Sequence, residues 1–195
     1  MILVSHRINS VKSLKKLSYN YGVEVDLRDF KNNIHLSHDP FKIGEQFTKY
    51  LKSFKHKFLI CNIKSERIEF KVLKLLKKFN IRNYFFLDSS FPMKVICLKK
   101  NINKQSIRFS KYENLPKTDF FNKIKWVWFD TYGELPKLEK LKYLKKMNKK
   151  VCLVCPRLHN KKFDKKKIKN FIKLNHQYID MVCTKKKNFS FWELK

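Results

Sequence analysis

Two acidic residues separated by one apolar residue, Glu24 and Asp26, are the clearest candidates for chemistry in the sequence. Residues two apart in a β-strand project from the same face, so the segment Val23 to Leu27 predicts two neighbouring carboxylates on one face. Neighbouring carboxylates repel each other, and a shared proton or a hard divalent cation such as Mg²⁺ or Ca²⁺ relieves that repulsion. A surface salt bridge to one of the many lysines is the alternative.

Two histidines follow other strand-like segments. His6 and Arg7 follow the segment Ile2 to Ser5, and His38 follows the extended segment Ile34 to Ser37. Two histidines can act as general base and general acid near neutral pH, and an arginine fork binds a phosphate bidentately. We expect these groups to meet the acidic pair at one end of the fold. Taken singly, each histidine is an ordinary packed or exposed residue.

The elements that would position these groups alternate along the chain with a period of about 20 to 30 residues. Eight short apolar runs have strand character: Ile2 to Ser5, Val23 to Leu27, Phe58 to Ile63, Tyr84 to Leu87, Ser106 to Phe109, Trp126 to Phe129, Val151 to Cys155 and Ile179 to Cys183. Lysine-rich stretches between them carry apolar residues at helical spacing, as amphipathic helices do.

Alternation of strands and helices predicts an α/β protein with parallel strands covered by helices. Eight units fit a compact (β/α)8 TIM barrel, which ordinarily takes about 250 residues. We therefore expect short loops and one or two vestigial helices, between Phe91 and Lys104 and between Phe109 and Lys125. An open doubly wound sheet is the alternative fold.

The few acidic residues favour the barrel. The chain has 16 of them, and seven lie at or just beyond the predicted carboxyl ends of strands, which is the active-site face of a barrel: Glu24, Asp26, Asp29, Asp39, Asp88, Glu113 and Asp130. Glycine-rich nucleotide-binding turns are missing from the sequence.

The net charge of +30, from 46 basic and 16 acidic residues, is the usual signature of a nucleic-acid or anionic-membrane partner. Alanine is absent, however, and Lys, Asn, Ile and Phe are abundant, which is the pattern of an AT-rich genome on any fold. Most of the excess charge is therefore assigned to solvated helix faces. We expect no specific nucleic-acid partner.

At 195 residues we expect a single domain over 1-195, without a signal peptide or transmembrane segment. Five cysteines in apolar contexts predict buried free thiols and a cytoplasmic protein. Cys152 and Cys155 have the spacing of a redox or zinc motif, but no second pair accompanies them. The oligomeric state stays open.

Three of these segments together resemble the HR, E-x-D and HD signature of the glycerophosphodiester phosphodiesterases, within the phospholipase-C-like phosphodiesterase superfamily. They are Ser5 to Arg7, Gly22 to Arg28 and Leu36 to Pro40. The resemblance continues more faintly through the later strands, covers most of the chain and looks most like a compact, divergent bacterial branch. Members of that branch tend to occur beside surface-polysaccharide genes.

The resemblance implies a divalent-metal-dependent phosphodiester hydrolase in which His6 and His38 are the acid/base pair. Arg7 and Lys64 would bind the phosphate of a small phosphodiester or sugar-phosphate substrate. The weakly bound Mg²⁺ or Ca²⁺ would be held by Glu24, Asp26 and Asn62. Trp128 is the best candidate for an aromatic substrate platform, and core packing is its alternative role.

The sequence departs from the family pattern at two places. Asn62 stands where the family's third-strand motif carries a glutamate ligand, so one negative charge is lost. The insertion that usually follows the HD segment is missing, since a helix is predicted to begin near Ile43. Two rival hypotheses therefore accompany the hydrolase: a catalytically impaired phosphate-binding barrel associated with surface-polysaccharide metabolism, and a basic binder of nucleic acid or membrane surfaces.

Overall fold

The computed structural model describes residues 1–116 and 118–194 and divides the chain into two compact units. The N-terminal unit is Arg7–Gln105, and the C-terminal unit combines Met1–His6 with Ser106–Lys195. Each unit contains its own alternation of strands and helices.

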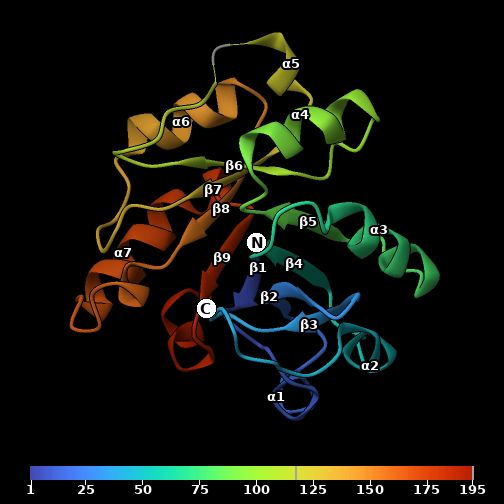
Figure 1. The fold of residues 1–195 in the computed structure, drawn as a ribbon. Coiled ribbons are helices and arrows are strands. Elements are labelled where there is room, and N and C mark those ends of the chain that lie inside the picture. The colour runs from blue at the N-terminus through green and yellow to red at the C-terminus, as the bar shows by residue number, and fades with distance from the viewer. Residues whose placement is uncertain (117, 195) are drawn as a thin grey trace. The chain divides into compact units, whose positions relative to one another are not determined.

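The N-terminal unit is built on a sheet in which β2 pairs with β4 and β4 pairs with β5, all in parallel. Its elements in chain order are α1 (Val11–Lys15), β2 (Gly22–Phe30), β3 (Asn33–Leu36), α2 (Phe47–Lys52), β4 (Phe58–Ile63), α3 (Glu69–Lys78), β5 (Tyr84–Leu87) and α4 (Phe91–Lys99). Figure 1 shows α3 running beside β4 and β5 on their outer side.

Strand β2 extends beyond its parallel partner as one arm of a hairpin with β3. The antiparallel register runs from Leu27 opposite Leu36 to Phe30 opposite Asn33. Lys31 and Asn32 form the turn with φ of 43° and 60°. Left-handed backbone at both central residues matches the right-handed twist of the strands, so this two-residue turn closes the hairpin without glycine.

The C-terminal unit has five parallel strands in the order β1, β9, β8, β7, β6. Its elements in chain order are β1 (Ile2–Ser5), β6 (Ser106–Phe109), α5 (Asp119–Asn122), β7 (Trp126–Phe129), α6 (Leu138–Lys146), β8 (Lys150–Val154), η1 (Pro156–Leu158), α7 (Lys165–Asn175), η2 (His176–Tyr178), β9 (Met181–Thr184) and η3 (Lys186–Phe191). Figure 1 shows α6 and α7 along one side of these strands.

Helices α3 and α6 bury a narrow apolar stripe and leave most of their lysines exposed. Val72 and Leu76 of α3 and Leu141 and Leu144 of α6 are fully buried, as amphipathic spacing requires. Left-handed asparagines follow α3, α4 and α6 directly after their caps: Asn80, Asn101 and Asn148. Asparagine tolerates that conformation, which supplies helix stops in a chain with only three glycines.

The order of elements through the whole chain is that of a compact (β/α)8 TIM barrel, so the predicted fold class is confirmed. Predicted and observed strands agree to within two residues at their starts, the largest difference being β9, which begins at Met181 rather than Ile179. The antiparallel β3 stands outside the alternation.

Two helix predictions were wrong. The segment after Phe91 was expected to be vestigial, but α4 has nine residues, as many as α6. Its apolar residues surround the helix instead of forming a stripe, so no helical period is visible in the sequence.

The second wrong prediction is the start of the helix after the HD segment, which begins at Phe47 rather than near Ile43. The chain before this helix packs against β3 instead, because Gly44 lies so close to Leu36 that a Cβ would come within 1.7 Å of the Leu36 carbonyl oxygen.

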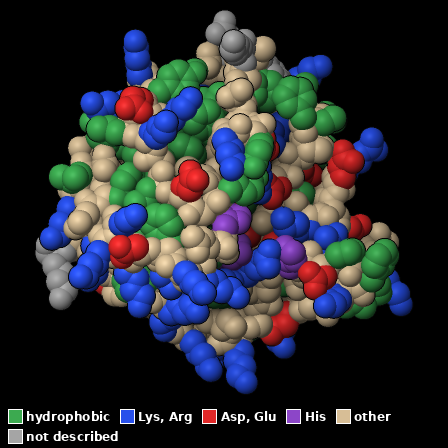
Figure 2. Space-filling view, turned by 90° about the vertical axis from the view of Figure 1, so that its left-hand side faces the viewer, with side chains coloured by type: hydrophobic (Ala, Val, Ile, Leu, Met, Phe, Trp, Pro, Cys, Tyr) green, Lys and Arg blue, Asp and Glu red, His purple; other side chains and the backbone are tan. Residues whose placement is uncertain are grey.

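The prediction of buried free thiols is confirmed, because all five cysteines are free and buried. Figure 2 shows Lys and Arg side chains across the whole face drawn, with apolar and acidic side chains between them. Among the described residues, no helix is long and apolar enough to cross a membrane.

Candidate active site

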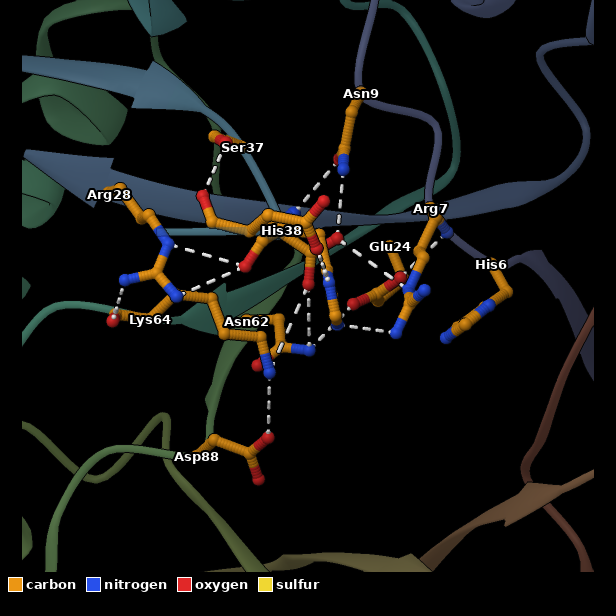
Figure 3. Close-up of polar contacts among 12 residues, drawn as sticks. His6, Arg7, Asn9, Glu24, Arg28, Ser37, His38, Asn62, Lys64 and Asp88 are labelled. Atoms are coloured by element: carbon orange, nitrogen blue, oxygen red, sulfur yellow. Dashed lines mark hydrogen bonds and ion pairs between the residues drawn. The ribbon is translucent and has the colours of Figure 1, made fainter. Parts of the chain in front are cut away.

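The acidic pair lies on β2 in the N-terminal unit and is completely buried. Glu24 and Asp26 are both 0% exposed. The side-chain amide of Asn62, on the neighbouring strand β4, lies between them and donates to Glu24 Oε1 at 2.8 Å and to Asp26 Oδ1 at 3.2 Å. Figure 3 shows the Asn62 amide near Glu24. The parallel register places Asp26 directly opposite Asn62, which explains the convergence.

Further donors come from the segment that precedes α1. The backbone N–H of Arg7 donates to Glu24 Oε2 at 2.7 Å. The Asn9 side chain donates to Asp26 Oδ2 at 2.8 Å and accepts from the Asp26 backbone N–H at 2.9 Å. Arg7 adopts a left-handed φ of 56°, a conformation that is uncommon outside glycine. This segment therefore holds both carboxylates in place.

Burial controls the ionisation of Glu24. The pKa of Glu24 is raised from its ordinary value of 4.5 to about 7, mainly by burial and secondly by the charge of the adjacent Asp26. Hydrogen bonds from Asn62 and from the Arg7 backbone oppose the shift, as does the positive charge of Lys64. The groups around the acidic pair therefore compensate its negative charge only in part.

Whether this donor set suits a divalent cation depends on Asn62. Its Oδ1 is buried and has no hydrogen-bond partner among the described residues. Rotating the amide by half a turn would direct that oxygen at the two carboxylates and give three oxygen donors, the type that Mg²⁺ and Ca²⁺ prefer. Within residues 1–116 and 118–194 no three His, Cys, Asp or Glu side chains form a metal-binding group. The pair fits a hard cation with Asn62 as its third ligand.

His38 lies beside the pair in a chain of side-chain contacts. Its Nδ1 contacts Asp39 Oδ1 at 2.8 Å, and its Nε2 contacts the Arg7 guanidinium. A guanidinium only donates, so this geometry places the ring proton on Nδ1 and the lone pair on Nε2. The contact with His38 and the neighbouring Lys42 lower the pKa of Asp39 to about 2. Asp39 therefore orients the imidazole as an ionised acceptor.

Lys64 and Arg28 complete the cluster in Figure 3. Lys64 Nζ lies 3.3 Å from Asp88 Oδ2 and 3.9 Å from Asp26 Oδ1. Arg28 donates to the backbone carbonyl of His38 at 3.0 Å and to that of Lys64 at 2.8 Å. One guanidinium therefore ties together the two loops that carry the histidine and the lysine.

Six of the eight predicted site residues gather in the N-terminal unit: Arg7, Glu24, Asp26, His38, Asn62 and Lys64. The other two belong to the C-terminal unit. His6 follows β1, and its backbone N–H donates to the Thr184 carbonyl at 2.8 Å. Trp128 lies on β7 and is 4% exposed, which is a packing position. Its indole Nε1 is buried without a hydrogen-bond partner among the described residues.

Asn9 and Arg28 are contributors that the sequence analysis did not single out. Asn9 has no distinguishing pattern around it. Arg28 lies in the quoted motif segment but received no role, because its contacts are with backbone carbonyls of two loops. The sequence feature that could have pointed to Arg28 is its place directly beyond the acidic pair.

Comparison with solved structures supports the fold. A glycerophosphodiester phosphodiesterase from Agrobacterium tumefaciens strain C58 matches with a TM-score of 0.72 and 11% identity, over 98% of this chain and 97% of that one. Two from Parabacteroides distasonis ATCC 8503 match with TM-scores of 0.66 and 0.63 and identities of 14% and 13%. These cover 97% and 93% of this chain, and 94% and 81% of theirs.

At the level of sequence, no family profile matches the chain, and no curated protein matches it. The chain therefore has the fold of the glycerophosphodiester phosphodiesterases, which confirms the resemblance seen in the sequence motifs at the level of the fold.

Proposed function

We propose that this protein is a divalent-metal-dependent phosphodiester hydrolase with glycerophosphodiesterase-like chemistry. The observation that carries the proposal is the contact of Arg7 with both the acidic pair and His38, in a chain with the fold of phosphodiesterases. A buried pair of carboxylates beside an oriented imidazole and a guanidinium is a costly arrangement that packing alone does not need.

His38 and His6 are the proposed acid/base pair. The Nε2 lone pair of His38 suits a general base, because Asp39 holds the opposite ring nitrogen. His6 directly precedes Arg7 in the chain and is assigned the other role. Water or a substrate hydroxyl attacks phosphorus while one histidine takes its proton. The bond from phosphorus to the leaving oxygen breaks, and the other histidine gives that oxygen a proton.

Arg7 and Lys64 are the proposed phosphate ligands. The exposed fraction of the Arg7 side chain is 43%, so its guanidinium is accessible, and it now donates to His38. A bound phosphate would take over that donor and release the imidazole. Both cations would stabilise the charge that builds up on phosphoryl oxygens.

Glu24, Asp26 and Asn62 are the residues that would hold Mg²⁺ or Ca²⁺. The cation, when bound, would supply positive charge to the phosphoryl oxygens. We propose a small phosphodiester or sugar phosphate as substrate, a single domain over 1-195, and, because all five thiols are free, a cytoplasmic location.

Hydrolysis of bis(p-nitrophenyl) phosphate and of glycerophosphodiesters, with Mg²⁺, Mn²⁺, Ca²⁺ or EDTA, tests the proposal. His6→Ala and His38→Ala should each reduce kcat by about 10²- to 10⁴-fold, as the loss of a general acid or base does. His176→Ala is the matched control, since His176 is exposed and lies outside the cluster. Undiminished rates in both variants would eliminate the mechanism.

A phosphate-binding barrel without catalysis is the second candidate. The position of the Asn62 amide favours it, because that amide already bridges the two carboxylates in the way a cation would. This candidate predicts phosphate binding that depends on Arg7 and Lys64, with no turnover under any metal condition.

A further inference from the structure

A cavity of about 320 Å³ lies at the carboxyl ends of strands β6 and β7, within the C-terminal unit. The loops that follow these two strands and the start of α6 supply its lining. In parallel α/β proteins, ligands bind beyond the carboxyl ends of the strands. A cavity of about 150 Å³ already holds benzene, so this one has room for a small organic molecule.

Two phenylalanines form the apolar side of this cavity. Phe109 and Phe129 are the last residues of β6 and β7, and the parallel register places them opposite each other. Their ring centres lie 5.0 Å apart, and the ring planes are inclined by 53°. Both residues are 4% exposed, so packing holds the rings in place. A third aromatic ring can meet such a tilted pair edge to face.

Lysines supply the charge of the same lining. Three exposed lysines and one exposed glutamate give it a formal charge of +2: Lys111, Lys137, Lys140 and Glu134. Lys140 Nζ lies 5.7 Å from the centre of the Phe109 ring. Lys137 is the N-cap of α6 and makes no side-chain capping bond, so the first turn of α6 adds partial positive charge. The potential in the cavity therefore favours an anion.

The combination of rings and lysines distinguishes this cavity, because lysines alone would not. The chain has 46 basic residues against 16 acidic ones, so any cavity near its surface has lysines around it. Two smaller cavities of the same unit are also lined by lysines, but their described linings contain no aromatic side chain. An apolar aromatic side next to a cationic one is a feature of the cavity after β6 and β7.

The two loops that line the cavity are fixed by their own contacts. After β6, Ser110 Oγ accepts from the backbone N–H of Tyr112 at 3.0 Å. After β7, Thr131 Oγ1 donates to the backbone carbonyl of Glu134. The rings of Tyr112 and Tyr132, one from each loop, meet edge to face with their centres 5.2 Å apart. A lining that is ordered in advance lowers the entropy lost on binding.

We propose that this cavity binds a small aromatic anion in which a carboxylate is joined directly to the ring. The ring packs against Phe109 and Phe129, and the carboxylate pairs with Lys140 and Lys137. The short distance from Lys140 Nζ to the Phe109 ring favours a compact ligand, since ring and charge must fit side by side. The inference does not rest on the proposed hydrolase function, because every group that it uses belongs to the C-terminal unit.

Three probes separate the two halves of the site. Benzoate carries the ring and the charge, acetate carries the charge alone, and benzyl alcohol carries the ring alone. The side-chain amide of Asn114, a lining residue, reports binding in ¹H–¹⁵N NMR spectra at constant pH and ionic strength. The exposed Asn33 of the N-terminal unit is the reference.

Benzoate should shift the Asn114 amide saturably and leave the Asn33 amide unchanged. It should bind at least about tenfold more tightly than acetate or benzyl alcohol, because it alone gains both ring burial and an ion pair. Intermolecular nuclear Overhauser effects should connect the benzoate ring protons with the rings of Phe109 and Phe129.

A pair of double variants tests the lysines. Lys137→Met/Lys140→Met should weaken benzoate binding about tenfold and leave the binding of benzyl alcohol unchanged. The matched control is Lys142→Met/Lys146→Met, which removes two exposed lysines of α6 that do not line the cavity. It lowers the net charge equally and should leave benzoate binding as in the native protein.

Three results would overturn the proposal. They are the lack of a benzoate shift at Asn114, equal affinities for benzoate and acetate, and equal benzoate affinities in the two double variants. Turnover enters none of these measurements, so failure of the proposed hydrolase function would leave the inference about this cavity standing.

Discussion

The two units each place an acidic side chain at the carboxyl end of a strand, but they neutralise it in different ways. In the C-terminal unit Asp130 follows β7 alone. His159 Nε2 lies 3.0 Å from its Oδ1, Arg108 Nη1 lies 4.0 Å from its Oδ2, and the Tyr132 backbone N–H donates to it at 2.9 Å. One carboxylate has several donors of its own.

The N-terminal unit buries two carboxylates and gives them a neutral amide in common. Asn62 brings no charge, Lys64 is shared with Asp88, and the Arg7 guanidinium lies 3.9 Å from Asp26. Buried charge without full compensation costs stability. The difference indicates that folding alone accounts for the Asp130 cluster, whereas the acidic pair is kept for a ligand or a reaction.

The largest expected difference between the two units is the loss of kcat/KM when one carboxylate is replaced in each. Asp26→Asn should lower kcat/KM for phosphodiesters by at least ~100-fold, because it removes charge that the proposed site needs. Asp130→Asn should leave kcat/KM close to the native value, because its cluster with His159 and Arg108 is assigned to folding alone. Steady-state kinetics measures both, and thermal unfolding checks that each variant folds. Equal losses would show that the Asp130 cluster belongs to the chemistry as well.

The second largest expected effect is the pH dependence of stability that the buried Glu24 of the N-terminal unit causes. Folded Glu24 keeps its proton up to a pKa of about 7, whereas the unfolded chain releases it near 4.5. The free energy of unfolding therefore falls as pH rises from about 4.5 to 7, by about 3 kcal/mol for this group. Urea unfolding in EDTA at pH 5 and 7.5 measures the change.

One variant serves as the control for that measurement. Glu24→Gln should lose this contribution, so its stability should fall less than that of the native protein over the same pH interval. If Glu24→Gln and the native protein show the same dependence, the carboxyl of Glu24 is ionised throughout and its environment is more polar than the buried cluster suggests.

The fold was predictable where the apolar pattern has a clear period. Short apolar runs marked the parallel strands because helices cover them on one side and neighbouring strands pair with them along their length. The hairpin was missed because Lys31 and Asn32 adopt left-handed backbone without glycine. Helix α4 was underestimated because its apolar residues do not fall on one face.

The site was predictable where residue type carries the role. Glu24, Asp26 and His38 stand in short motifs, and the register of β2 with β4 explains why Asn62 joins them. Asn9 and Arg28 could not be found in this way, because they act through contacts that depend on loop conformation. The burial of Trp128 likewise depends on the packing around β7 rather than on the residue itself.

The smallest expected effect is the change in affinity for a divalent cation when a negative charge is added at Asn62. The pair with Asn62 carries a formal charge of about −2 when ionised, and electrostatics dominates the affinity of oxygen sites for hard cations. The native protein should thus bind Mg²⁺ or Ca²⁺ at the weak, millimolar end of such sites. Asn62→Asp brings a third carboxylate and should tighten binding about tenfold by calorimetry, an extra charge-assisted ligand being worth that much. Asn33→Asp, at the exposed first residue of β3 in the same unit, adds equal charge outside the cluster and should leave the affinity for the cation unchanged. If Asn62→Asp leaves the affinity unchanged while Asp26→Asn destroys it, Asn62 is not a ligand. If no variant binds a cation, the phosphate-binding barrel is the better account, because the Asn62 amide then already does what a metal would do.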